Sequence, residues 1–316
     1  MTEATPRSGE AVVRIAGLSR QFARKMALVD VSLEIPRGAV YGLVGENGAG
    51  KTTLIKHILG LYRATVGSVQ VFGMNPVEEP EAVLGRIGYL SEDRELPGWM
   101  RVSELMRYTQ AFYPQWDSAY ANALCEMFEL DKGARLKHLS RGELAKAGLL
   151  AALAHRPDLL LLDEPSSGLD PVVRRDILSA VIRTVAEEGR TVLFSSHNLD
   201  EVERVADHVT MIYHGRVVMN TSMDDLRDLH HRVVLRSPNG RTEPPRLPGM
   251  LSVEIHRGEW SYLCEGTLDA VKGAAAESGA ELLEIASPSL EDIFVARAKG
   301  TGLPARMVEV GQEVTP

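Results

Sequence analysis

The apolar positions of this chain follow two spacings that predict different secondary structure. Continuous or alternating apolar runs, typical of strands, occur at residues 12–15, 29–35, 39–44, 67–73, 86–91, 159–162, 191–196, 209–213 and 216–219. Helical spacing separates several of these runs, at residues 52–60, 102–130, 144–155 and 171–188. Strands that alternate with helices in this way predict an α/β domain over residues 11–222.

Two stretches refine this picture of the α/β domain. Pro114 breaks the helical pattern of residues 102–130, so we expect a pair of helices there, within a helical subdomain of about residues 95–157. Four consecutive leucines at 159–162 predict a strand that is buried on both faces, as in a parallel sheet.

The pattern changes after residue 222. Shorter strands and helices from 223 to 298 predict a small α+β domain, and residues 299–316 are expected to form a disordered tail. No catalytic constellation stands out in this part of the chain. We interpret His230 and His231 as a solvated pair rather than a metal site.

Composition narrows the class of protein. The 316 residues are 44% hydrophobic and 25% charged, which is ordinary for a globular protein of about two domains. The net charge of −8 argues against a broad nucleic-acid surface, and no nucleic-acid partner is expected. Cys125 and Cys264 stand far apart, which fits a reducing cytosol. No uncharged apolar run is long enough to span a bilayer, so any membrane role is that of a peripheral partner.

A glycine-rich loop between a predicted strand and a predicted helix is the strongest chemical signal. It has the form G-x-x-x-x-G-K-[ST] and consists of Gly45, Glu46, Asn47, Gly48, Ala49, Gly50, Lys51, Thr52 and Thr53. Its glycines let backbone N–H groups surround an anion, and the helix that follows adds the positive end of its dipole. The Lys51 ammonium can reach the β- and γ-phosphates of a nucleotide, and the Thr52 hydroxyl can ligate Mg²⁺.

Acidic and polar residues follow two of the other predicted strands. Asp163 and Glu164 come directly after the four leucines, at the sheet edge where ligands of open α/β sheets bind. Asp163 is a candidate Mg²⁺ ligand through water, and Glu164 is a candidate for polarising an attacking water. His197 ends the strand at 191–196, which places it at the same edge. Ser140 starts a helix and satisfies a capping box with Glu143, so a structural role and an anion-binding role both remain open for it.

In this order, the motifs resemble those of the ATP-binding cassette (ABC) ATPases over about residues 11–220. The resemblance implies a P-loop NTPase with a mixed sheet core, and it implies ATP and Mg²⁺ as cofactors. It assigns adenine stacking to Phe22, contact with ATP of the opposite subunit to Ser140 and Gly142, coupling between the two sites to Asp170, and the switch histidine to His197.

The resemblance also implies partners and a location. These are a homodimer, or a heterodimer with a sister ATPase subunit, and a separately encoded multi-span permease at the inner face of the cell membrane. Residues 112–117 are similar to a segment of the bacitracin-export-like branch. Residues 287–294 are similar to the ending of many antibiotic-export ATPases, so export is the expected direction.

Two positions depart from the family pattern. Arg141, Gly142 and Glu143 stand where the family usually has Gly-Gly-Gln. Arg141 therefore brings a positive charge to a loop that approaches phosphate. Glu92 stands where the family usually has glutamine; its carboxylate can accept a hydrogen bond from a Mg²⁺-bound water but cannot donate one as an amide does.

Three other functions compete with a transport ATPase. An ABC ATPase that acts on ribosomes usually carries two cassettes in one chain, and this chain has one. A DNA-repair ATPase of the coiled-coil type needs a very long insertion between the P-loop and the signature motif. The segment between Lys51 of the P-loop and Ser140 of the signature motif is too short to contain one. A regulatory module that binds ATP with weak hydrolysis fits the departures at Arg141 and Glu92.

Overall fold

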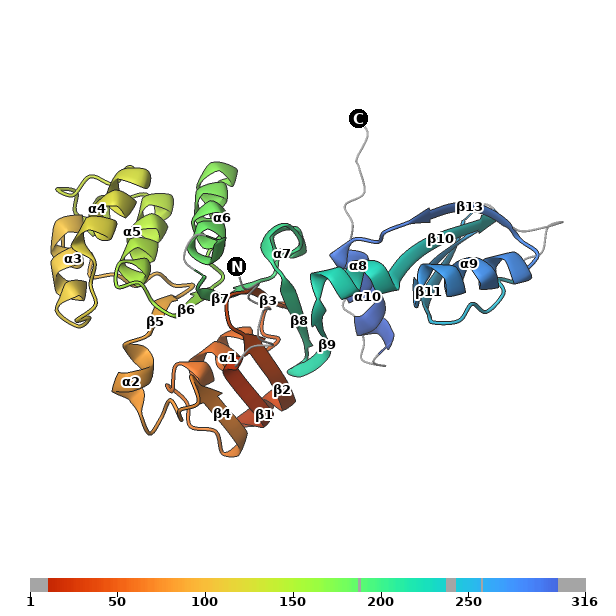
Figure 1. Ribbon diagram of the computed structural model, residues 1–316, viewed down its shortest axis with the longest axis horizontal. Coiled ribbons are helices and arrows are strands. Elements are labelled where there is room, and N and C mark those ends of the chain that lie inside the picture. The colour runs from red at the N-terminus through yellow and green to blue at the C-terminus, as the bar shows by residue number, and fades with distance from the viewer. Residues whose placement is uncertain (1–10, 187–188, 237–242, 257, 301–316) are drawn as a thin grey trace, which may run out of the picture. The chain divides into compact units, whose positions relative to one another are not determined.

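The computed structural model describes residues 11–186, 189–236, 243–256 and 258–300 (Figure 1). Contacts within the chain divide it into two units, Met1–Ser222 and Met223–Pro316, and the division falls at the residue where the sequence pattern changes.

A mixed sheet forms the centre of the first unit. Among the described residues this sheet has six strands in the order β5-β6-β7-β3-β8-β9. Their bounds are Ile87–Leu90, Leu159–Asp163, Thr191–Ser196, Val40–Val44, His208–Tyr213 and Arg216–Ser222. All neighbours pair in parallel except β8 and β9, which are antiparallel. The expected mixed sheet is thereby confirmed, with β3, the strand that leads into the glycine-rich loop, between β7 and β8.

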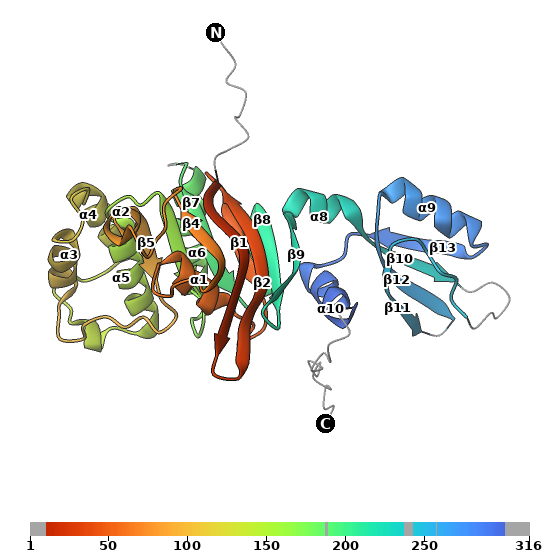
Figure 2. The ribbon, with the colours of Figure 1, turned by 90° about the horizontal axis from the view of Figure 1, so that it is seen from below.

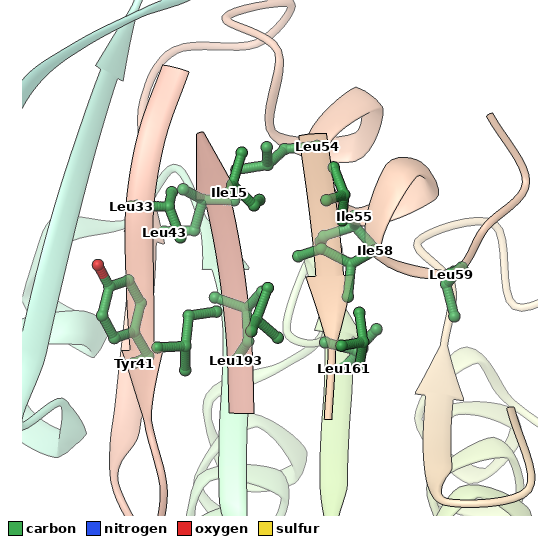
Figure 3. Close-up of a cluster of buried hydrophobic side chains, with 14 of the residues drawn as sticks. Ile15, Leu33, Tyr41, Leu43, Leu54, Ile55, Ile58, Leu59, Leu161 and Leu193 are labelled. Atoms are coloured by element: carbon green, nitrogen blue, oxygen red, sulfur yellow. The ribbon is translucent and has the colours of Figure 1, made fainter. Parts of the chain in front are cut away.

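An antiparallel sheet and a helix cover one face of this mixed sheet. The antiparallel sheet has the order β2-β1-β4, formed by Lys25–Pro36, Ala11–Phe22 and Val66–Val71, and Figure 2 shows β1 and β2 side by side. Helix α1 (Lys51–Ile58) contributes Leu54, Ile55 and Ile58 to the buried core, with Leu161 of β6 among its neighbours (Figure 3).

Helices α6 (Pro171–Ala186) and α7 (Leu199–Val205) pack against β3 and β7. A Cβ on Gly42 of β3 would lie 2.4 Å from Val202 of α7, so only glycine lets this helix approach so closely. All four leucines of β6 are fully buried, which confirms the strand buried on both faces.

The predicted helical insertion is present as α3 (Val102–Gln110) and α4 (Ser118–Met127), separated as expected around Pro114. They lie with α5 (Arg141–Leu153) in Figure 1, and a short helix, α2 (Pro80–Leu84), precedes β5. Asp117 accepts a hydrogen bond from the Tyr120 N–H and caps α4. The insertion is joined to the sheet through α5, which packs on β5.

The second unit is a small α+β domain, as expected. Among its described residues, the sheet has the order β11-β12-β10-β13, and α9 lies on one face of it (Figure 2). The strands are Met250–His256, Glu259–Glu265, His230–Arg236 and Glu281–Ala286, and the helices α8, α9 and α10 are Met223–Leu229, Leu268–Glu277 and Leu290–Gly300. Its core includes Trp260 and Tyr262. Helix α10 extends two residues into the predicted tail, and residues 301–316 lie outside the described residues.

The expectation of a solvated histidine pair is wrong. His230 and His231 are 3% and 7% exposed. The His230 ring contacts the Leu226 carbonyl through Nδ1 and an Arg297 guanidinium nitrogen through Nε2, at 3.0 and 3.4 Å. Both histidines start β10 where α8 ends, so the turn into the sheet carries them inward. Within the described ranges, no cluster of three or more His, Cys, Asp and Glu side chains has metal-binding geometry. Over the same ranges, every helix is too short or too polar to cross a bilayer.

Candidate functional site

The glycine-rich loop is held in a space that larger residues do not fit. A Cβ on Gly45 would lie 2.2 Å from the Ile212 carbonyl oxygen, and one on Gly50 would lie 2.5 Å from the Ala27 carbonyl oxygen. Gly50 has a φ of +117° and is the N-cap of α1, where no side chain caps the helix. The N–H groups of the first turn of α1 have no partner within the helix. The loop therefore forms a backbone cradle that fits a phosphate group.

Lys51 lies at the bottom of this cradle and is 5% exposed. Its ammonium donates to the Gly45 and Glu46 carbonyl oxygens at 2.6 and 3.3 Å. It also lies 2.9 Å from Oε1 of Glu164, in an ion pair whose two side chains are 6% and 4% exposed. The first turn of α1 and the end of β6 are thus joined by a buried charge pair.

Glu164 has a φ of +48°, which is a strained value for a residue with a side chain. Its N–H donates to the Ser195 hydroxyl at 2.9 Å, and its Oε2 lies 2.7 Å from Nδ1 of His197. Ser195 of β7 and His197, which directly follows this strand, therefore hold Glu164 in place. This confirms that Glu164 and His197 share one sheet edge.

Asp163 is 1% exposed, and its Oδ1 accepts a hydrogen bond from the Ser195 hydroxyl at 2.6 Å. Its Oδ2 is buried and has no hydrogen-bond partner among the described residues. A buried carboxylate oxygen without a partner is costly unless a cation or a water molecule satisfies it. Asp163 and Thr52, which lines the cavity over the loop, carry oxygen donors of the kind that Mg²⁺ prefers, so these residues fit a magnesium ion.

A cavity of about 400 Å³ opens over the loop. It is lined by Phe22, Lys25, Ala27, Asn47, Gly48, Gly50, Lys51, Thr52, Thr53, Glu92 and Glu164. The structure therefore brings Phe22, the loop, Glu92 and Glu164 together around one space. Burial and the nearby carboxylates of Glu164 and Asp163 raise the pKa of Glu92. Phe22 is 38% exposed, and its ring packs edge-on against the Tyr62 ring with 5.5 Å between the two ring centroids.

Ser140, Gly142 and Asp170 do not line this cavity. Ser140 caps α5: its hydroxyl accepts from the Glu143 N–H and donates to the Glu143 carboxylate, which also accepts from the Ser140 N–H. These hydrogen bonds lower the pKa of Glu143. Asp170 accepts from the N–H groups of Val172 and Val173 at the start of α6. The capping box is thus present, and it occupies the serine hydroxyl.

Gly142 is buried for a packing reason. A Cβ at this position would lie 2.8 Å from Cγ2 of Val173, so glycine allows α5 to approach α6. Arg141 is exposed beside it, and a Cβ on Gly168 would lie 3.7 Å from an Arg141 guanidinium nitrogen. Arg141 therefore extends along the loop that leads from Glu164 to Asp170.

The comparisons with known proteins assign this architecture. Residues 28–167 match the ABC transporter family. The chain is 32% identical over 314 residues to the daunorubicin/doxorubicin resistance ATP-binding protein DrrA of Streptomyces peucetius, with 93% of each chain covered. The chain belongs to the ABC transporter family.

Other ABC proteins extend the comparison. The bacitracin transport ATP-binding protein BcrA of Bacillus licheniformis is 28% identical over 308 residues, which cover 90% of this chain and 96% of BcrA. A solved ATP-binding subunit of an ABC transporter superimposes with a TM-score of 0.63 at 29% identity, covering 68% of this chain and 92% of that chain. The dimeric cassette MJ0796 shares the fold, with a TM-score of 0.61 at 21% identity over 67% of this chain and 98% of that one. The protein is thus an ABC ATPase.

Three residues of this ABC cassette were not found by sequence reasoning. Lys25 lines the cavity, and a Cβ on Gly48 would lie 3.7 Å from its ammonium. Ser195 joins Asp163 to the Glu164 backbone. Arg94 is buried two residues after Glu92. None of the three belongs to a sequence motif with a fixed spacing. Ser195 could have been suspected only because it lies near the end of a predicted strand, at the sheet edge of Asp163 and Glu164.

Proposed function

We propose that this ABC ATPase works as a dimer around two Mg-ATP and drives a separate membrane permease, most simply for export. The observation that carries the proposal is the buried set of Lys51, Glu164 and Asp163 beside a phosphate cradle, with the more exposed His197 in contact with Glu164. The names of the relatives DrrA and BcrA, one a resistance protein and the other a transport protein, support the export direction.

Hydrolysis at this site depends on positioning and charge. The loop N–H groups and the Lys51 ammonium hold the β- and γ-phosphates, and the Phe22 ring supports the adenine. Thr52 and, through water, Asp163 and Glu92 would hold Mg²⁺, which would neutralise the charge that develops on the phosphate oxygens. Glu164 accepts a hydrogen bond from the attacking water and orients it. His197 holds the Glu164 carboxylate at 2.7 Å, and its proposed role as the switch histidine is to contact the γ-phosphate.

The Lys51–Glu164 ion pair gives this mechanism an ordered exchange of partners. While the Lys51 ammonium lies 2.9 Å from the Glu164 carboxylate, the two opposite charges compensate each other. A γ-phosphate is a stronger partner for an ammonium than one carboxylate oxygen, because it offers more charge and more acceptors. ATP therefore draws Lys51 away and leaves Glu164 to bind water.

The second half of each ATP site comes from the opposite subunit. Ser140 and Gly142 start α5, whose N-terminus favours an anion, and Arg141 adds a positive charge at the same end. Asp170, at the start of α6, couples the two sites. Closure requires the Ser140 hydroxyl to leave the Glu143 carboxylate, 2.7 Å away, and to donate to phosphate instead.

The permease binds on the helical subdomain and on the loop that carries Glu92. Trp99, Tyr108 and Phe112 are 69%, 50% and 63% exposed there, which is unusual for aromatic residues away from an interface. A cavity of about 330 Å³ lies between the loop after β5, α3 and α5. A permease on this surface keeps the ATPase at the inner face of the cell membrane.

The Glu164→Gln variant tests the proposed function. We expect it to bind ATP, to lose turnover by at least 100-fold and to accumulate as an ATP-bound dimer in size-exclusion chromatography, because a glutamine fills the same space without the negative charge. Glu126→Gln, an exposed change on α4, is the matched control and keeps wild-type turnover. Glu164→Gln turnover at the wild-type rate would show that the assignment is wrong.

A regulatory ATP-binding module is the second candidate, because the Glu143 carboxylate occupies the Ser140 hydroxyl. Turnover of the protein alone and after co-purification with the membrane protein of the adjacent reading frame separates the two functions. A transport ATPase is stimulated by its permease, whereas a regulatory module stays slow in both preparations.

A further inference from the structure

A tight turn after β5 carries two charged residues in different directions. The Arg94 N–H donates to the Ser91 carbonyl oxygen at 3.2 Å and closes the turn. Glu92 lines the ATP cavity, whereas Arg94 is 9% exposed. Arg94 has a φ of +48°, a left-handed value that is unfavourable for arginine. Such a conformation persists only where other contacts hold it, so the buried guanidinium must make contacts that matter.

Those contacts are with the loop that begins at Glu164. One terminal nitrogen of Arg94 donates to the Pro165 carbonyl oxygen at 3.0 Å and to the Ser167 carbonyl oxygen at 2.8 Å. The Ser167 N–H donates to the Glu164 carbonyl oxygen at 3.1 Å. The loop is therefore a compact turn from Glu164 to Ser167. Arg94 thus joins segments that are 71 and 73 residues apart in the sequence.

The charges around Arg94 show that this contact is not an ordinary ion pair. Its guanidinium donates to two backbone carbonyl oxygens. The Glu92 carboxylate favours the charged guanidinium from a distance, and the Arg141 guanidinium opposes it. A buried arginine that donates to carbonyls fixes backbone position, because both acceptors must keep their places for the charge to stay satisfied.

We propose that Arg94 is a positioning residue for ATP hydrolysis, which holds the Glu92 turn and the Glu164 loop at a fixed spacing. The strained φ values at both Arg94 and Glu164, each +48°, mean that either turn relaxes if this contact is lost. The two carboxylates then lose their alignment around the Mg²⁺ and the attacking water. This inference rests on the proposed role of Glu164.

The Arg94→Met variant tests the inference, because methionine keeps much of the volume and removes every donor. We expect kcat to fall about 10- to 100-fold, since displacement of a catalytic group by about 1 Å has effects of this size. The dissociation constant for ATP stays within about threefold of wild type, because the cradle and Lys51 are unchanged. Arg94→Lys, which keeps a charged donor, recovers part of kcat. Arg107→Met, an exposed change on α3, is the control and keeps wild-type kcat.

Further measurements keep the result interpretable. Hydrogen exchange at the Ser167 and Leu169 amides, which are bonded within the loop, becomes faster in Arg94→Met while exchange in β3 stays at the wild-type rate. If Arg94→Met fails to fold, Arg94→Lys decides: a kcat reduced at least threefold with an unchanged ATP dissociation constant supports the role, and wild-type kcat overturns it. A folded Arg94→Met with kcat within twofold of wild type also overturns it. Glu164→Gln, measured in parallel, separates this failure from a failure of the proposed function, which would leave Glu164→Gln active.

Discussion

The buried Lys51–Glu164 pair makes a quantitative prediction for the stability of the protein without nucleotide. Lys51→Met removes the ammonium and leaves the Glu164 carboxylate, 4% exposed, with His197 beside it. Removal of one member of a buried ion pair costs about 3–5 kcal/mol, because the remaining charge is buried without compensation. Glu164→Gln costs less, about 1–2 kcal/mol, because Lys51 keeps its hydrogen bonds to the Gly45 and Glu46 carbonyl oxygens.

The double variant Lys51→Met with Glu164→Gln gives the coupling energy. With both charges gone, no buried ion is left unpaired, so its cost is lower than the sum of the two single costs by at least about 2 kcal/mol. The assay is urea unfolding of the nucleotide-free protein, followed by tryptophan fluorescence in a Trp260→Phe background, so that Trp99 and Trp116 of the first unit give the signal. For a unit of this size, a loss of about 3 kcal/mol also lowers Tm by roughly 6–12 °C.

An exposed pair of similar geometry supplies the control. Arg14 and Glu34 lie 2.7 Å apart, but their side chains are 56% and 60% exposed. Arg14→Met therefore costs less than about 1 kcal/mol. If Lys51→Met unfolds within about 1 kcal/mol of wild type, the reasoning from burial is refuted, and the pair contributes no more than a surface contact.

Two further predictions concern the helical subdomain and its junction with the sheet. Burial lowers the pKa of His155 to about 4, and its Nε2 lies 3.0 Å from the Ile87 carbonyl oxygen; because the unfolded chain binds a proton at His155 below about pH 6.5 and the folded chain does not, stability falls as the pH drops from about 6.5 towards 4, by roughly 2 kcal/mol at pH 5. His155→Gln removes the group that binds this proton in the unfolded chain. Urea unfolding at pH 7 and pH 5 therefore shows a smaller loss of unfolding free energy for the variant than for wild type, and equal losses contradict the assignment. Gly142→Ala places a methyl group 2.8 Å from Val173 and costs about 1–3 kcal/mol in thermal unfolding. Gly273→Ala in α9 is its control, since a Cβ there meets no atom within 4 Å, and it leaves stability unchanged or raised by up to about 1 kcal/mol; a Gly142→Ala variant as stable as this control contradicts the packing argument.

Features that depend on residues close together in the chain could be predicted from the amino-acid sequence. The glycine-rich loop was recognisable because its chemistry requires glycine, lysine and threonine at fixed local spacing. The leucines of β6 predicted a strand buried on both faces because only a strand covered on both sides tolerates such a run. The capping box at Ser140 and Glu143 was likewise visible, since its two partners lie within one helical turn. The order of these motifs along the chain also carried the family resemblance.

Contacts between residues far apart in the chain became visible in the folded structure. The Lys51–Glu164 pair, the Ser195 hydrogen bonds and the contact of Arg94 with the Pro165 and Ser167 carbonyls join residues from different strands and loops. No local periodicity encodes these contacts, because they arise from the order of strands in the sheet. Burial gave a further correction: His230 and His231 look solvated by composition, yet the turn from α8 into β10 carries both inside. Gly142 fits a phosphate-binding motif in sequence, but it is the approach of α5 to Val173 of α6 that requires a residue without a side chain there.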